Sequence, residues 1–161
     1  RFSLDTAASP VSKENLAIAK SWLASSDEYN LLVNGTAITA FPVYYQNDLA
    51  LLRQSLRIVQ AGTEVAEVKG KDLIPAHGLA MSRLLKTSVF PTEALIYEQA
   101  IAYLRKEAIV LPPSVPRGYV LVTYKEIPLG FVKNIGNRAN NLYPQEWRIR
   151  SGYLPDDIRT L

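Results

Sequence analysis

Hydrophobic positions in the first part of the chain follow two different periods. From Ser12 to Ala24 they recur three and four residues apart, which predicts an amphipathic helix with Ser12 as its N-cap. Leu31 to Val33 and Ala37 to Phe41 then flank Asn34-Gly35. That dipeptide tolerates the positive φ angles of a tight turn. The pattern therefore predicts a helix followed by a β-hairpin.

The period returns to that of a helix after the hairpin. Leucines three and four positions apart predict a short helix over Asp48 to Ser55. We therefore expect residues 1–55 to form a small α/β subdomain of helix-hairpin-helix type. The following residues have more strand and loop character, with short strands expected at Ile58 to Val59 and at Glu64 to Val68.

Helices and a second hairpin are expected in the remaining two thirds. One helix is predicted over Pro75 to Leu85, and another from Phe90-Pro91-Thr92 to about Lys106, with Pro91 in its first turn. The prolines between Leu111 and Pro116 predict a stiff connector. The apolar stretch from Gly118 to Lys133 then predicts the final hairpin.

Taken together, these elements predict an α+β fold. Short strands interrupted by two helices favour a small, partly closed mixed β-barrel with flanking helices over residues 56–161, preceded by the subdomain of residues 1–55. The chain has 161 residues, 48% of them hydrophobic and 20% charged, as in ordinary globular proteins. It has no apolar run near the ~20 residues that span a bilayer, and its first residues lack the apolar core of a signal peptide. We expect a cytoplasmic protein without a membrane partner.

Several kinds of chemistry are excluded by missing residues. The chain has no cysteine, which excludes disulfides, thiolate metal sites and cysteine nucleophiles. Its eight glycines never fall two positions apart, so no G-x-G loop can bring the backbone close to a nucleotide-like cofactor. We expect no catalytic residue, no metal and no cofactor in this chain. It begins with Arg1 and its only methionine is Met81, so we also expect it to be part of a longer protein.

Cations, aromatic rings and asparagines alternate near the end of the chain. A net charge of +3 and a pI near 9.1 permit a polyanionic partner without requiring one. Cations neutralise phosphates and aromatic rings stack on unpaired bases, and proteins hold RNA in both ways. The candidate RNA-binding residues of this region are Lys133, Arg138, Asn140, Asn141, Tyr143 and Arg148. From composition alone the alternative is favoured, namely that the aromatics pack a core while the charges solvate its surface.

Other charged residues receive a plainer interpretation. Arg105 and Lys106 are expected to be ordinary solvated charges at the end of a helix. His77, the only histidine, has no carboxylate at helical spacing beside it. We therefore favour a structural role for His77 over general acid or base catalysis.

Two blocks of residues resemble a known family in their order and separation. The first is Pro75-Ala76-His77-Gly78-Leu79-Ala80, and the second runs from Pro128-Leu129-Gly130 through Lys133, Asn141, Tyr143 and Pro144 to Arg148. Together they resemble the C-terminal region of the NOL1/NOP2/Sun family of RNA cytosine-5 methyltransferases, in particular the RsmF-type enzymes. That region comprises a PUA-like RNA-binding domain and the small domain before it. Where the family often has Lys-Asn-His-Tyr-Pro, this chain has Asn140-Asn141-Leu142-Tyr143-Pro144, without the lysine and the histidine.

The resemblance implies a non-catalytic segment that positions structured ribosomal RNA for a separate catalytic domain. Ribosomal RNA and that domain in cis would be its partners. S-adenosylmethionine would be the cofactor of the parent methyltransferase and not of this chain. The resemblance adds His77 to the candidate RNA-binding residues, with a structural role left open. The alternative is an intramolecular or protein-interaction module that braces the catalytic domain with little RNA contact.

Overall fold

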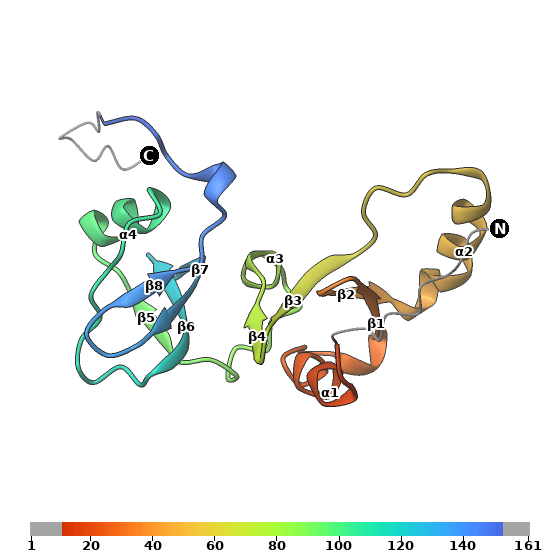
Figure 1. The fold of residues 1–161 in the computed structure, drawn as a ribbon, viewed down its shortest axis with the longest axis horizontal. Helices are drawn as coiled ribbons and strands as arrows, with labels where there is room; N and C mark the ends of the chain where they lie inside the picture. Colours follow the sequence, from red (N-terminus) through yellow and green to blue (C-terminus); the bar gives the residue numbers. More distant parts are fainter. Residues whose placement is uncertain (1–10, 153–161) are drawn as a thin grey trace. The chain divides into compact units, whose positions relative to one another are not determined.

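The chain divides after Pro91 into two compact units, seen in the ribbon of Figure 1. We call the part up to Pro91 unit 1 and the part from Thr92 onward unit 2. The computed structural model describes residues 11–152. Each unit contains one four-stranded sheet together with helices. The expected α+β class is therefore confirmed.

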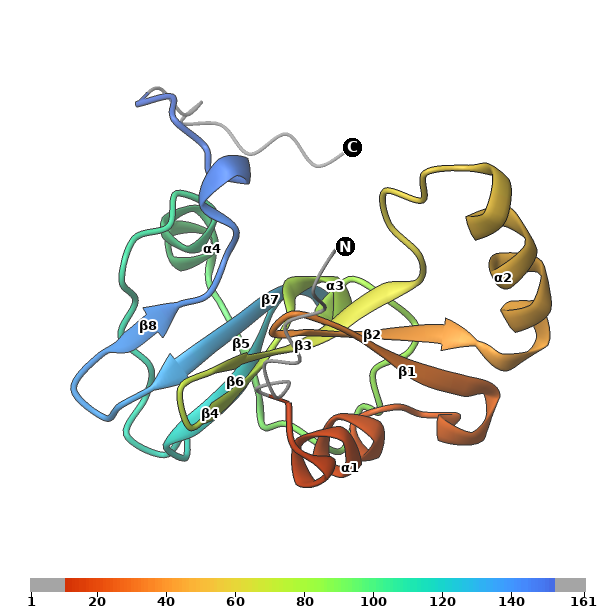
Figure 2. The same cartoon turned by 45° about the vertical axis from the view of Figure 1, so that its right-hand side comes forward.

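Unit 1 is built on an antiparallel sheet with strands in the order β1-β2-β3-β4, and β1 to β3 lie side by side in Figure 2. Its elements are α1 (Lys13–Ser21), η1 (Ser26–Glu28), β1 (Tyr29–Asn34), β2 (Ala37–Pro42), η2 (Val43–Tyr45), α2 (Gln46–Ser55), β3 (Thr63–Lys69), β4 (Asp72–Pro75) and α3 (His77–Ala80). Both α1 and α3 contact β3. Helices α1 and α3 therefore both pack on the sheet at β3, one of its two inner strands.

Local sequence signals explain the first elements of unit 1. The Asn15 N–H donates to Ser12 Oγ at 3.1 Å, so Ser12 caps α1 as the sequence predicts. Gly35 has a φ of +60° in the turn between β1 and β2, which confirms the expected hairpin. Within β2, Ile38 and Ala40 are buried while alternate residues are partly exposed. One sheet face is therefore buried and the other is more open.

Unit 2 is a mixed sheet with strands in the order β5-β6-β7-β8. Its elements are β5 (Thr92–Ala94), α4 (Tyr97–Leu104), β6 (Gly118–Tyr124), β7 (Ile127–Asn134), β8 (Ala139–Asn141) and η3 (Gln145–Trp147). The pairing of β5 with β6 is parallel, and the other two pairings are antiparallel. An isolated bridge between Ile109 and Ala139 extends the sheet beyond β8.

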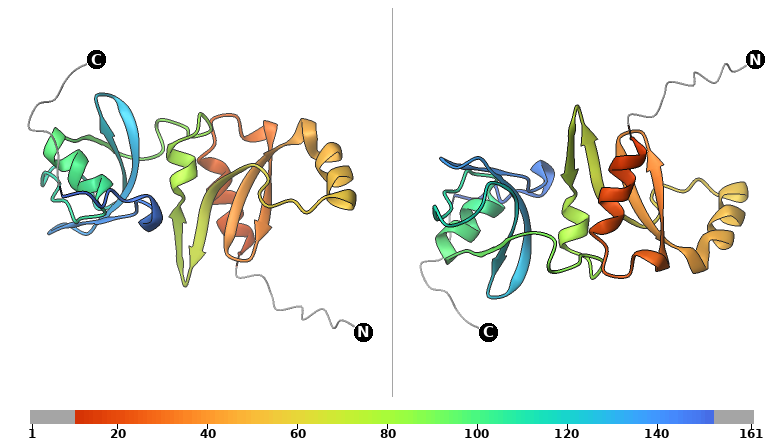
Figure 3. Two further views of the ribbon diagram at one scale, coloured as in Figure 1. Left: turned by 90° about the horizontal axis from the view of Figure 1, so that it is seen from above. Right: turned by 90° about the horizontal axis from the view of Figure 1, so that it is seen from below.

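The core of unit 2 lies between α4 and one face of this sheet (Figure 3). Ala100 and Tyr103 of α4 are buried there, and the sheet contributes Val120, Val122 and Val132. The Tyr103 hydroxyl donates to the Phe131 carbonyl at 3.2 Å. This hydrogen bond compensates for burying a phenol in an apolar core.

Three expected elements differ from the structure. The helix expected over Pro75 to Leu85 is a single turn, α3, because residue 75 ends β4 instead. The helix expected from Phe90 begins only at Tyr97, since Thr92–Ala94 pairs with β6 as a strand. Ile58 and Val59 lie in the loop between α2 and β3 and form no strand.

The barrel expectation also requires correction. The final hairpin, β6 and β7, pairs with β5 and β8 and not with strands near Ile58. Residues 11–152 contain two separate sheets and no closed barrel. The division after Pro91 also differs from the expected boundary between residues 55 and 56, because β2 and β3 on either side of that boundary pair in one sheet.

Candidate nucleic-acid interface

The C-terminal end of α4 is closed by a left-handed turn. Lys106 has a φ of +67°. Its N–H donates to the Tyr103 carbonyl at 2.9 Å, and the Glu107 N–H donates to the Ala102 carbonyl, also at 2.9 Å. These two hydrogen bonds form a Schellman cap, in which glycine usually takes the left-handed position. With lysine there, the turn is retained despite the strain of a side chain at positive φ.

Residues 141–152 are attached to this end of α4 by hydrogen bonds. The Asn141 amide donates to the Tyr103 carbonyl at 2.7 Å and to the Glu107 carbonyl at 2.9 Å. The Ile149 N–H donates to the Leu104 carbonyl at 2.9 Å. The Leu104 carbonyl is one that a helix end otherwise leaves without a partner, and the Tyr103 carbonyl accepts from Asn141 in addition to the Lys106 N–H. They fix the path of the chain after β8.

Two cationic side chains of the helix end strengthen the attachment. Arg105 Nη2 donates to the carbonyls of Ser151 at 3.0 Å and of Gly152 at 3.3 Å. Lys106 Nζ donates to the Tyr143 carbonyl. Burial lowers the pKa of Lys106, and the nearby Glu146 carboxylate partly offsets that effect. The expectation that Arg105 and Lys106 are ordinary solvated charges is therefore wrong.

This attachment gathers three arginines around one open cavity of about 370 Å³. Arg105 comes from the end of α4, while Arg148 and Arg150 come from the attached segment. Glu107 is the one acidic residue among the lining residues. Guanidinium groups bind phosphate oxygens through paired N–H donors and keep their charge at any physiological pH. The cavity thus has the donors and the charge to hold a phosphate group.

Two of the predicted RNA-binding residues are engaged within unit 2. The Asn141 side chain makes the two donor bonds described above, and its Oδ1 accepts the Tyr143 N–H at 2.8 Å. The Tyr143 ring packs on the core cluster, with its centroid 5.5 Å from that of Tyr103 and the planes inclined by 65°. Asn141 and Tyr143 therefore support the segment that carries Arg148.

Lys133 and Asn140 lie on one sheet face in neighbouring strands. Lys133 is directly opposite Asn140 of β8 and Tyr119 of β6. Side chains at directly opposed positions share a face. Lys133 Nζ lies 5.5 Å from the centroid of the Tyr119 ring, within the range of a cation–π contact. Neither Lys133 nor Asn140 is among the residues that line the arginine cavity.

Arg138 is exposed in the turn between β7 and β8. Arg117 approaches the same turn, since a Cβ built on Gly136 would lie 2.9 Å from Arg117 Nη2. Arg117 is not among the candidate residues predicted from the sequence. Its position just after the proline-rich connector carries no local signal for a contact with residue 136.

His77 is the first residue of α3 in unit 1, whereas the other six predicted residues belong to unit 2. Burial lowers the pKa of His77 below its ordinary value of 6.5. The lowered pKa favours the neutral form of the imidazole. A neutral side chain contributes no charge to the binding of phosphate.

Other kinds of site have no support among the described residues. Within residues 11–152, no three His, Asp or Glu side chains gather as a metal site would require. In the same range, no helix combines the length and the apolar character needed to cross a membrane.

Comparison with known proteins shows what unit 2 is similar to. Residues 92–149 match the family model of the methyltransferase RsmF PUA domain, and this range runs from β5 to just beyond η3. The chain is also 28% identical over 138 residues to ribosomal RNA small subunit methyltransferase F of Enterobacter sp. (strain 638). That alignment covers 86% of this chain and 27% of the relative, so the chain spans about a quarter of the relative's length. The family resemblance seen in the sequence is thus confirmed at the level of residues 92–149, which are similar to the PUA domain of the methyltransferase RsmF.

Proposed function

We propose that this chain is the RNA-binding part of a ribosomal RNA cytosine-5 methyltransferase that works in the cytoplasm. It would hold structured ribosomal RNA for a catalytic domain elsewhere in the same polypeptide. The match of unit 2 to an RsmF PUA domain supports this proposal, as does the similarity to a ribosomal RNA methyltransferase. The observation that carries it is the convergence of Arg105, Arg148 and Arg150 on one cavity.

The arginine cavity suits the RNA backbone better than a base. Arginine binds phosphate through charge and paired hydrogen bonds, and such contacts fix the position of a nucleic acid without reading its sequence. The attachment of residues 141–152 to α4 holds two of the three arginines in place before RNA arrives. Preorganisation of this kind reduces the ordering cost of binding.

Lys133, Asn140 and Arg138 would extend the contact. Lys133 and Asn140 are neighbours across β7 and β8, and Arg138 lies in the turn that joins these strands. A lysine adds a phosphate contact, and an asparagine amide can both donate to and accept from a base edge or a 2′-hydroxyl. We assign Asn141 and Tyr143 to support of the segment.

The reaction itself would belong to another part of the polypeptide. Methylation at cytosine C5 requires a nucleophile that adds to C6, and a thiolate is suited to that task. This chain has no cysteine and no G-x-G loop for S-adenosylmethionine. The isolated chain should therefore neither bind S-adenosylmethionine in calorimetry nor methylate RNA.

A bracing module with little RNA contact is the competing function. The two are separated by measuring the affinity of the 161-residue chain for a structured ribosomal RNA fragment over a series of salt concentrations. RNA binding through phosphates predicts an affinity that falls steeply as salt rises, because counterions are released on binding. Absence of binding at low salt by the folded chain would favour the bracing module.

A further inference from the structure

Unit 1 carries a concentration of exposed apolar side chains. The described residues have fifteen exposed large hydrophobic side chains, and eight of them lie between residues 33 and 59. These eight, which we call the α2 patch, are Val33, Val43, Tyr44, Tyr45, Leu51, Leu52, Leu56 and Val59. Single exposed apolar residues are normal, but a high density of them along one stretch of chain is typical of an interaction surface.

Helix α2 is the centre of this patch and is poorly covered. Leu49 is its one buried residue, while Leu51 is 65% exposed and Leu52 is 46% exposed. It packs mainly against the short η2 turn that precedes it. A helix of ten residues gains most of its stability from tertiary packing. The uncovered leucines therefore suit a partner that completes this packing.

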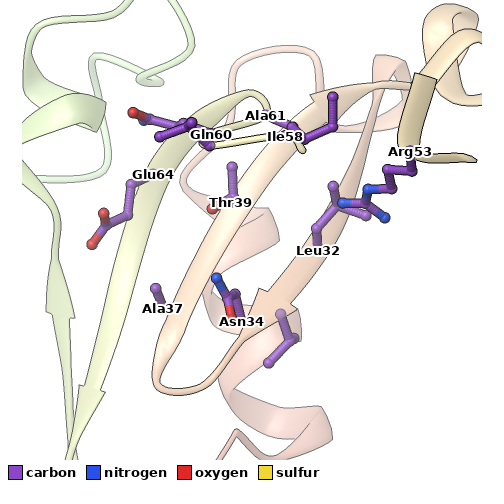
Figure 4. A pocket seen from close by; sticks show the side chains of 11 residues that line it. Leu32, Asn34, Ala37, Thr39, Arg53, Ile58, Gln60, Ala61 and Glu64 are labelled. Carbon is purple, nitrogen blue, oxygen red and sulfur yellow. The ribbon is translucent and has the colours of Figure 1, made fainter. Parts of the chain in front are cut away.

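An open cavity of about 550 Å³ adjoins the patch on the more open face of the sheet (Figure 4). Strand residues such as Leu32 and Thr39 form one side, and the loop residues Ile58 and Ala61 form the other. Val33 and Val59 belong both to this lining and to the α2 patch. The patch and the cavity therefore meet at these two residues.

We infer that the α2 patch is the docking surface for the methyltransferase domain of the same polypeptide. This inference rests on the proposed function, which requires such a domain. The chain aligns with 27% of its methyltransferase relative, so most of that relative lies outside the region compared. A domain tethered in cis has an effective concentration of about millimolar, so a surface of modest size is sufficient for docking.

The chemistry of the patch selects a protein over RNA. RNA binding relies on cations that neutralise phosphates. Between residues 43 and 59 the charged residues are Asp48, Arg53 and Arg57, set among seven of the eight apolar side chains. Interfaces with proteins have apolar and aromatic residues at their centre and charges at their rim. The α2 patch fits that description and the arginine cavity of unit 2 does not.

Hydrogen–deuterium exchange of the full-length methyltransferase and of the isolated 161-residue chain tests this inference. We expect backbone amides of residues 46–56 to exchange at least about 10-fold more slowly in the full-length protein, because docking suppresses local opening of α2. The variant Tyr44→Ser/Leu51→Ser/Val59→Ser should remove this protection. A matched variant, Val110→Ser/Ile96→Ser/Ile127→Ser, changes three similarly exposed apolar residues of unit 2 and should leave it intact.

Equal exchange in the two proteins would overturn the inference. Protection that rises with the concentration of the isolated chain would also overturn it, in favour of a second copy. Protection that appears only when RNA is added would identify RNA as the occupant instead. The RNA affinity of the Tyr44→Ser/Leu51→Ser/Val59→Ser variant distinguishes a failure of the docking inference from a failure of the proposed function. This variant keeps every arginine of unit 2, so the proposed function predicts that it still binds RNA. A full-length protein without a methyltransferase domain would contradict both the docking inference and the proposed function.

Discussion

The side-chain amide nitrogen of Asn141 lies 2.7 Å from the carbonyl oxygen of Tyr103, where it joins the end of β8 to the end of α4. Asn134 has the same arrangement in β7. Its amide donates to the carbonyls of Val115 at 3.0 Å and of Pro116 at 3.1 Å, and its Oδ1 accepts the Gly136 N–H at 3.0 Å. Two asparagines thus attach loops to the sheet of unit 2.

Replacing Asn141 by alanine should destabilise unit 2. The change removes two donated hydrogen bonds and one accepted bond. Loss of such a group lowers the free energy of unfolding by about 1–3 kcal/mol when a buried partner is left unsatisfied. Asn140→Ala is the matched control, because that exposed neighbour should change stability by less than about 0.5 kcal/mol. Chemical denaturation checks both, and equal stabilities of the two variants would contradict the supporting role of Asn141.

Tyr143→Leu should lower thermal stability and leave the salt dependence of RNA binding unchanged. The ring packs against Tyr103 with centroids 5.5 Å apart, and an aromatic pair contributes about 1 kcal/mol beyond its buried area. Melting curves give the first effect, and RNA titrations well below the melting temperature give the second. A variant with wild-type stability and weak RNA binding would instead indicate that Tyr143 stacks on a base.

Local signals allowed part of this fold to be predicted. Ser12 as N-cap and Asn34-Gly35 as a turn act on neighbouring residues, so the sequence shows them directly. By contrast, Thr92–Ala94 becomes a strand because it pairs with Leu121–Thr123, far along the chain. The hydrophobic period cannot reveal such a partner, and it therefore predicts a helix for the stretch before α4.

The candidate site was predicted in the same uneven way. The sequence indicated Arg148 because it lies among aromatic residues and asparagines. Arg105 was missed because its importance depends on residues 151 and 152, which reach it only in the folded chain. A basic residue in the last turn of a helix is common for reasons of the helix dipole alone, so it gives no specific signal.

The protonation of His77 should make unit 1 sensitive to mild acid. Burial places its pKa in the folded state below the ordinary value of 6.5. Between that lowered pKa and pH 6.5, the unfolded chain binds a proton that the folded chain does not. Stability is therefore fully present above about pH 6.5 and declines as the pH falls through this window.

Two measurements check this prediction. As the only histidine, His77 gives a single imidazole resonance whose titration midpoint should lie below 6.5. His77→Gln should flatten the fall in stability between pH 6.5 and 5.5. Burial and the neighbouring Glu67 carboxylate raise the pKa of Glu64. The contribution of Glu64 to stability therefore increases as the pH falls, opposite to that of His77. A midpoint at or above 6.5 would contradict the account.

Gly62 and Gly35 should respond very differently to alanine. At Gly62 φ is +80°, and a Cβ would lie 2.2 Å from the Ala40 carbonyl oxygen. At Gly35 φ is +60°, with nothing within 4 Å of the added carbon. Gly35→Ala should lower the free energy of unfolding by about 1 kcal/mol, from backbone strain alone. Gly62→Ala should cost at least about 2–3 kcal/mol because it adds a backbone clash to strain. Equal losses in denaturant titrations would show that the loop of residues 58–62 shifts easily.

The arginine cavity is tested most directly by the salt dependence of RNA affinity in Arg148→Gln/Arg150→Gln. If each arginine neutralises one phosphate of a single-stranded RNA, the slope of log affinity against log salt should flatten by about 1.4. The control Arg53→Gln/Arg57→Gln removes the same charge from unit 1 and should leave the slope near that of the unmodified chain. Unchanged affinity and slope in the folded Arg148→Gln/Arg150→Gln variant would contradict the proposal that this cavity holds RNA.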